Sequence, residues 1–106
     1  MKSYNLNQMI KGWFVGDFSP TSLKTSACEV ALKRYKAGDY ELKHFHKVAT
    51  EITVIVSGRV VMCGKEWDAG SIVVLSPGDV TDFQVLEDAH TVVVKIPCLP
   101  NDKYLV

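Results

Sequence analysis

His44, His46 and Glu51 are the residues of this 106-residue chain whose types and spacing could bind a metal ion. In an extended strand, side chains two residues apart project to the same face, so the two imidazoles lie close enough to bind one ion. Neutral imidazole is the commonest ligand for divalent transition metals, and a nearby carboxylate completes such a site. Gly38 and Gly58 flank these residues and predict turns at both ends of a strand, loop and strand unit.

The spacing of these five residues resembles the first sequence motif of the cupin superfamily. The order is Gly38, five residues, His44, one residue, His46, four residues, Glu51, six residues and Gly58. The resemblance implies an all-β fold, the double-stranded β-helix or jelly roll, with residues 1–106 forming one domain. It also implies one divalent metal ion, which could be zinc, iron, manganese or nickel.

The second cupin motif is only partly present. Counting from Gly70, Gly78 falls at the expected glycine, and Pro77 lies one residue after the family's proline. Thr81 occupies the position where the family usually has its last metal-binding histidine. We therefore expect three protein ligands, with open positions for water and substrate.

Three residues could substitute for the missing histidine. Asp82 could reach the metal if its strand carries a bulge, although simple alternation turns it away from the site. Thr81 points the right way, but a neutral hydroxyl is a poor ligand and suits hydrogen bonding better. His90 is a good ligand chemically, yet it follows an acidic turn, where a side chain more often faces solvent.

A second group of candidates consists of polar residues inside otherwise apolar β-runs. Glu29, Lys33 and Tyr35 share one face of an early strand, and Lys95 interrupts a late one. Burying unpaired charges costs several kcal/mol, so these side chains lie either on an outer face or around a polar cavity. If the cavity is formed, Lys33, Tyr35, Lys95 and Glu51 are the candidates for moving protons.

Short β-runs separated by turn residues predict an all-β sandwich or barrel. The expected strands are 13–15, 26–36, 40–47, 51–56, 59–63, 72–75, 80–86 and 90–96. Turns are expected at 57–58, 64–66, 67–70, 76–79 and 87–88, and residues 1–12 have weak helical character. The apolar run Ile72–Leu75 predicts a strand buried on both faces, whereas Pro97 and Pro100 make residues 97–106 an extended tail.

The composition of the chain limits the kinds of partner and the cellular location that we expect. Twelve basic and twelve acidic residues give no net charge, which argues against nucleic acid or an anionic membrane surface as a partner. No apolar run is long enough to cross a bilayer and the N-terminus lacks a signal-peptide core, so we expect a cytoplasmic protein. Cys28, Cys63 and Cys98 are odd in number and far apart, which favours free thiols.

Two classes of function follow. The first is a metal-dependent enzyme acting on a small polar metabolite: a sugar isomerase or epimerase, which small single-domain cupins resemble, or an iron-dependent dioxygenase. The second is a non-catalytic module that binds a metal and a metabolite or carbohydrate. Turnover of a keto-sugar panel would separate the two classes.

We also expect a homodimer. The apolar residues at 13–15, Phe18 and 104–106 offer more apolar surface than a small barrel readily absorbs. Two-fold dimers are the commonest homo-oligomers, and a dimer would also cover exposed strand edges. The competing possibility is that both segments fold back on their own barrel.

Overall fold

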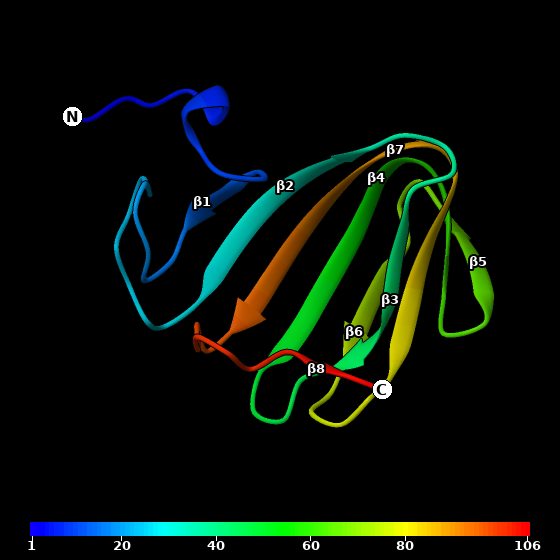
Figure 1. The fold of residues 1–106 in the computed structure, drawn as a ribbon. Helices are drawn as coiled ribbons and strands as arrows, with labels where there is room; N and C mark the ends of the chain where they lie inside the picture. Colours follow the sequence, from blue (N-terminus) through cyan, green and yellow to red (C-terminus); the bar gives the residue numbers. More distant parts are fainter.

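In the computed structural model, which describes residues 1–106, two long strands organise the fold. β4 (Thr50–Met62) and β7 (Thr81–Ile96) pair antiparallel along most of their lengths. The pairing changes register between Ile55 and Val60, and both strands bend there. As a result, one eight-stranded sheet folds over on itself into two facing layers (Figure 1).

The other strands extend the two layers on either side of this pair. The first layer contains β1 (Trp13–Val15), β2 (Glu29–Tyr35), the C-terminal half of β7, the N-terminal half of β4 and β6 (Ile72–Leu75). The second contains β8 (Tyr104–Leu105), β3 (Tyr40–Phe45), the other halves of β7 and β4, and β5 (Lys65–Asp68). A short 3-10 turn, η1 (Leu6–Gln8), precedes them. The predicted all-β jelly roll is confirmed.

The hydrophobic core fills the space between the layers near the bend. It comprises Ile55, Val60, Met62, Val73, Leu75, Phe83, Val85 and Ala89, and Tyr35 and Trp67 pack against it. Because β4 and β7 alternate inward and outward side chains, each strand contributes three of its inward residues to this core. The strand ends that carry Glu51 and Thr81 lie farthest from the bend, so the buried polar residues gather at the opposite, open end of the sandwich.

Two predicted turns are wrong because long-range pairing overrides local turn chemistry. Ser57–Gly58 and Glu87–Asp88 lie inside β4 and β7, which continue through them as irregular, bent strands. Gly58 has φ of +86°, and a Cβ there would lie 2.2 Å from the Asp88 carbonyl oxygen. The glycine therefore marks a close crossing of two bent strands.

Most of two further predicted turns, 64–66 and 67–70, is instead the strand β5. Cys63 and Gly64 both have positive φ, the geometry of a two-residue hairpin turn, so β5 pairs with the end of β4. The tail contributes only β8 at the edge of β3, as the prolines predict. No helix of the chain is long and apolar enough to span a membrane.

The prediction that Ile72–Leu75 is buried on both faces is also wrong for the isolated chain. Val73 and Leu75 are buried in the core, but Ile72 is 62% exposed and Val74 is 55% exposed. The reason is that no element of the chain covers the outer side of β6, which pairs only with β4.

We predict that Gly58→Ala destabilises the fold far more than Gly38→Ala. Both glycines have positive φ, which costs an alanine about 1 kcal/mol. Only Gly58 also has backbone atoms within reach of the new methyl group, whereas a Cβ at Gly38 meets nothing within 4 Å. Urea unfolding of both variants measures the difference, and equal free energies of unfolding would show that the crossing can relax.

Candidate functional site

His44 and His46 lie at the open end of the sandwich, where β3 ends. His44 is opposite Thr81 in the β3–β7 ladder, and His46 follows the strand by one residue. Both side chains are buried, and their rings meet edge to face with centroids 5.7 Å apart. The spacing in the sequence therefore brings both imidazoles to the concave side.

Backbone carbonyls fix the tautomer of both imidazoles. Nδ1 of His44 lies 2.7 Å from the Leu42 carbonyl oxygen, and Nδ1 of His46 lies 2.6 Å from the Asp102 carbonyl oxygen. A carbonyl oxygen only accepts, so each Nδ1 carries the proton and donates it. Nε2 of each neutral ring then keeps its lone pair, which is the arrangement that a metal-binding histidine requires.

His46 and Glu51 form the central pair. Nε2 of His46 lies 3.5 Å from Oε1 of Glu51, and the two residues are 5% and 8% exposed. Nε2 has no hydrogen-bond partner although it is fully buried. A nitrogen lone pair that faces a buried carboxylate is unfavourable unless a proton or a metal cation lies between them. Nε2 of His46 and the Glu51 carboxylate are therefore atoms that fit a bound cation.

The pKa shifts reflect the same pairing. The pKa of His46 is raised, chiefly by its contact with Glu51, with burial acting in the opposite direction. Burial alone would raise the pKa of Glu51, but His46 and the nearby Lys95 outweigh it, so this pKa lies below its usual value. The carboxylate is thus held in its charged, ligand-competent form.

Asp102 also belongs to the site, and the sequence analysis missed it. The residue is 9% exposed, and its carboxylate accepts hydrogen bonds from the backbone N–H groups of Lys47, Val48 and Ala49. Burial would raise its pKa, but these N–H groups outweigh burial and lower it. Asp102 lies 51 positions after Glu51, so no local pattern links the two residues. Only its place in the tail that begins with Pro97 and Pro100 could have drawn attention to it.

The structure does not bring the three candidate substitutes into the site as ligands. The Thr81 hydroxyl donates its proton to the Asp82 carbonyl oxygen and accepts from the Cys63 N–H, so it acts as a hydrogen-bond partner between two segments. The Asp82 carboxylate accepts from the Tyr40 hydroxyl, as strand alternation predicts. His90 is exposed near the bend, beside the Ser57 hydroxyl, far along the strand from the other histidines.

Glu29, Lys95 and Glu51 form one row across three neighbouring strands. Lys95 is the register partner of both glutamates, and its ammonium lies 3.8 Å from Glu29. Glu29, Lys95 and His46 line a cavity of about 230 Å³, which the tail residues 99–103 close on one side. The predicted polar cavity is therefore present at the open end.

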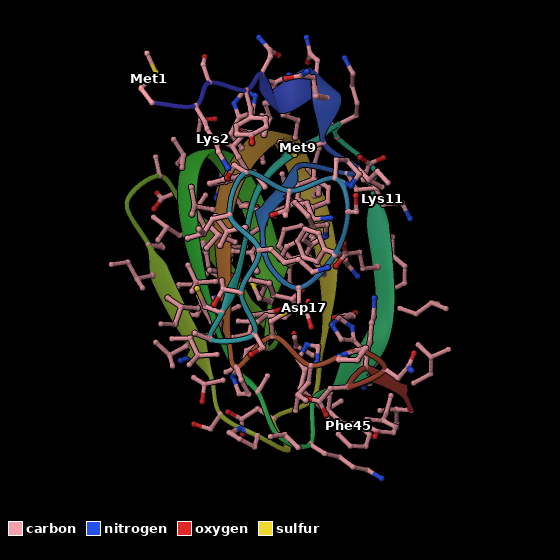
Figure 2. The ribbon with its side chains drawn as sticks, turned by 90° about the vertical axis from the view of Figure 1, so that its left-hand side faces the viewer. Met1, Lys2, Met9, Lys11, Asp17 and Phe45 are labelled. Carbon is pink, nitrogen blue, oxygen red and sulfur yellow. The ribbon has the colours of Figure 1, made fainter.

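Lys33 and Tyr35 line a different cavity of about 560 Å³, together with Glu41 and residues of the N-terminal segment. Trp13 lies between the two lysines, whose ammonium groups are 5.0 Å (Lys33) and 5.1 Å (Lys95) from its ring centroid. Figure 2 looks toward the N-terminal segment, with Lys11 and Asp17 labelled on that side. The four predicted catalytic residues thus divide into two pairs, Glu51 with Lys95 and Lys33 with Tyr35.

Tyr35 is unsuited to act as a base. Its hydroxyl donates to Glu41 at 3.1 Å and its ring packs against Phe83. Burial and the Glu41 carboxylate raise the pKa of Tyr35 far above its usual value. Burial also lowers the pKa of Lys33, although Glu41 acts the other way.

The structure does not gather three His, Cys, Asp or Glu side chains into one metal-sized cluster. His46 and Glu51 meet directly, while His44 touches the pair through its ring contact with His46. The three-ligand site therefore stays a prediction. A cation at Nε2 of His46 would require a small adjustment of the side chains around it.

Solved structures share this architecture. A Klebsiella pneumoniae protein with a double-stranded β-helix domain superimposes with a TM-score of 0.69 and 23% identity, covering 79% of this chain and 74% of that one. The DMSP lyase DddQ from Ruegeria pomeroyi superimposes with a TM-score of 0.72 and 18% identity, and the match covers 89% of this chain and 49% of the lyase. This chain therefore spans about half the length of that lyase. An oxalate decarboxylase variant from Bacillus subtilis superimposes with a TM-score of 0.65 and 19% identity, and the match covers 77% of this chain and 25% of the decarboxylase.

No family model and no curated protein matches the sequence. The structural likeness is nevertheless consistent across these proteins. The chain has a double-stranded β-helix fold, which is the fold that the resemblance of its first motif to the cupin superfamily implies.

We predict that Glu51→Gln weakens metal binding more than Asp82→Asn. Glu51 faces His46 inside the site, whereas Asp82 binds the Tyr40 hydroxyl outside it. The Glu51 change should lower zinc affinity by more than the roughly 10–100-fold that loss of an outer-shell partner costs. Chelator competition measures both variants, and a larger loss for Asp82→Asn would place a bulge in β7 that redirects its side chain.

We predict that Tyr35→Phe lowers the free energy of unfolding by about 1–3 kcal/mol at neutral pH, because Glu41 loses its donor. A folded-state pKa above the unfolded value of about 10 means that this stabilisation is fully present below pH 10. It is lost as pH rises further toward the folded-state pKa. Urea unfolding at several pH values should show the two proteins converging only above about pH 10, and convergence at lower pH would contradict the assignment.

Proposed function

We propose that the protein binds one divalent metal ion through His46, Glu51 and His44, and that it takes a small polar metabolite in the adjoining cavity. The observation that carries this proposal is the buried Nε2 of His46, which has no hydrogen-bond partner and faces the Glu51 carboxylate. A bound divalent metal would supply a Lewis acid able to polarise a carbonyl or hydroxyl oxygen.

The cavity beside His46 favours a small ligand that carries both hydroxyl and carboxylate groups. Its volume of about 230 Å³ lies below the range typical of drug-sized ligands. Lys95 and Lys103 offer cationic donors, while Glu29 and Asn101 offer acceptors for hydroxyl groups. The name of one structural neighbour, an oxalate decarboxylase, agrees with a small anionic substrate without identifying one.

The chain's own residues can bind and orient such a ligand. Lys95 is held between Glu29 and Glu51 in the strand register, so its ammonium is fixed at the cavity wall. Glu51 lies beside it as a charged carboxylate and is the group best placed to accept a proton from a ligand hydroxyl. Tyr35 and Lys33 lie at the other cavity and have no role in this proposal.

Metal content tests the first half of the proposal. Protein purified without chelators should contain close to one divalent metal per chain by elemental analysis, or take up one zinc or cobalt ion on titration. The His44→Ala, His46→Ala double variant should lose this stoichiometry, because it removes both imidazoles. Full stoichiometry in the double variant would sink the metal assignment.

A matched ligand pair tests the second half. An aldose and the aldonate of the same carbon number differ at C1, which is an aldehyde or ring hemiacetal in the first and a carboxylate in the second. Thermal shifts with each, in the presence of metal, show which form is preferred. The aldonate should raise the melting temperature more, and Lys95→Met should remove the difference. Stronger binding of the aldose would favour a neutral sugar, and oxygen consumption with ferrous iron would point instead to a dioxygenase.

A further inference from the structure

One residue of the tail, Asp102, binds four consecutive residues of the loop between β3 and β4. Its carbonyl oxygen accepts from Nδ1 of His46 at 2.6 Å. Its carboxylate accepts from the N–H groups of Lys47 at 3.0 Å, Val48 at 3.2 Å and Ala49 at 2.9 Å. These partners are 53 to 56 positions away in the sequence, so the contacts form only when the tail docks.

The tail is anchored on both sides of Asp102. Before it, Cys98 is buried, and its N–H donates to the Ser26 carbonyl oxygen at 3.0 Å. After it, β8 pairs with β3, and the Tyr104 ring stacks on Phe45 with centroids 5.5 Å apart. The segment 98–106 is therefore a strap across the open end, with Asp102 at its centre (Figure 1).

Each part of Asp102 has a separate physical effect on the site. The carbonyl oxygen holds the proton of His46 on Nδ1 and so presents the Nε2 lone pair toward Glu51. The carboxylate satisfies three N–H groups of a loop that has no strand partner at this point, and it fixes the loop that carries His46.

We propose that the strap, through Asp102, is the positioning element of the His46 site, so that tail docking and cation binding are coupled. Asp102 is a positioning residue that acts through His46. The coupling to a metal rests on the proposed function, whereas the control of the His46 tautomer does not. Undocking the strap should free the ring, remove its preferred tautomer and weaken metal binding.

The first test uses metal-free protein, so that it does not depend on metal binding. Ring nitrogen chemical shifts report the His46 tautomer at a pH about two units above the usual histidine pKa of about 6.5, with His46→Gln to assign the signals. Wild type should show the Nδ1–H tautomer, and Asp102→Ala should shift the ring toward the Nε2–H form. Amide exchange of Lys47, Val48 and Ala49 should become faster in the same variant.

The second test measures zinc affinity by chelator competition. Asp102→Ala should lose about 10–100-fold, the usual cost of removing an outer-shell partner. Asp39→Asn is the matched control, because the Asp39 carboxylate also accepts a backbone N–H, from Lys36, in a loop away from the site. If Asp102→Ala does not fold, Asp102→Asn, which keeps the side-chain shape, replaces it in both tests.

The outcomes separate the two proposals. An altered tautomer with no metal binding by wild type supports the strap and refutes the proposed function. Metal binding by wild type with an unchanged tautomer and affinity in both Asp102 variants refutes the strap. An equal loss in Asp39→Asn would show a general effect of loop destabilisation and would also refute it.

A separate observation concerns the outer face of the first layer. Two rows of aliphatic residues cross β2, β7, β4 and β6 in register, and they define what we call the aliphatic face. The rows are Leu32, Val92, Val54, Ile72 and Val30, Val94, Ile52, Val74. No charged residue interrupts the rows, because the charged residues Glu29, Lys33, Glu51 and Lys95 of these strands alternate with them and face the other side.

We infer that a second copy of this chain covers the aliphatic face. The two rows span four strands at about 4.8 Å spacing and three residues at about 3.3 Å rise, a flat area of about 190 Å². Val56 and Ile96, the next residues on the same side of β4 and β7, are about half exposed and extend this area. Protruding side chains and flanking residues must supply the rest of the roughly 800 Å² per partner of a standard interface. An uncharged face offers nothing to a charged partner, whereas two such faces complement each other about a two-fold axis.

Trp13 and Tyr104, two of the residues first expected to form the dimer, contact their own barrel instead, whereas Leu105 and Val106 stay exposed. The Trp13 ring packs against the lysine ammonium groups, and Tyr104 stacks on Phe45. The expectation of a homodimer therefore depends on the aliphatic face.

Sedimentation equilibrium at micromolar concentration tests this inference. Wild type should sediment near twice 11.8 kDa. Ile72→Glu should give the monomer, because it introduces a charge into the face. Leu42→Glu is the matched control, since Leu42 is equally exposed at 62% but lies on β3 in the other layer. A wild-type monomer, or equal dissociation by both variants, would overturn the dimer and leave the face to another kind of partner.

Discussion

The antiparallel pairing of β4 with β7 is the constraint on which the rest of the structure depends. The two strands run together from the open end of the sandwich, through the bend, into the second layer. β2 and β3 also pair directly with β7, whereas β5 and β6 pair with β4. β1 and β8 join the sheet at its edges, next to β2 and β3. The bend separates two environments on one concave surface: an apolar core beside it and a polar cavity at the open end.

The polar end is tolerable energetically because its charges are arranged in a row. An isolated buried carboxylate or ammonium would cost several kcal/mol, and a pair breaks even only with good geometry. Lys95 is flanked by Glu29 and Glu51 in the register, and Glu51 in turn meets His46. At this end Nε2 of His46 is buried without a hydrogen-bond partner, and this is the observation on which the proposed cation rests.

The sequence predicted the fold and the placement of the two histidines on one side because both depend on local signals. Strand alternation brings His44 and His46 to one side, and turn residues mark most of the hairpins. The errors arise where long-range contacts prevail. Gly58 and Glu87–Asp88 look like turns locally, but β4 and β7 hold each other extended through them. Ile72 and Val74 look buried, but within one chain nothing covers their face.

Asp102 shows the same limit at the level of the site. No local pattern links it to His46, because the contact exists only after β3, the loop 46–49 and the tail meet in three dimensions. Its carboxylate can satisfy three N–H groups only in a loop already shaped by the fold, and that loop is fixed only when the carboxylate arrives. Site geometry and tail docking are therefore mutually dependent, since each satisfies polar groups that the other would leave buried and unpaired. A motif of ligands identifies the chemistry of such a site, whereas its geometry is a property of the whole folded chain.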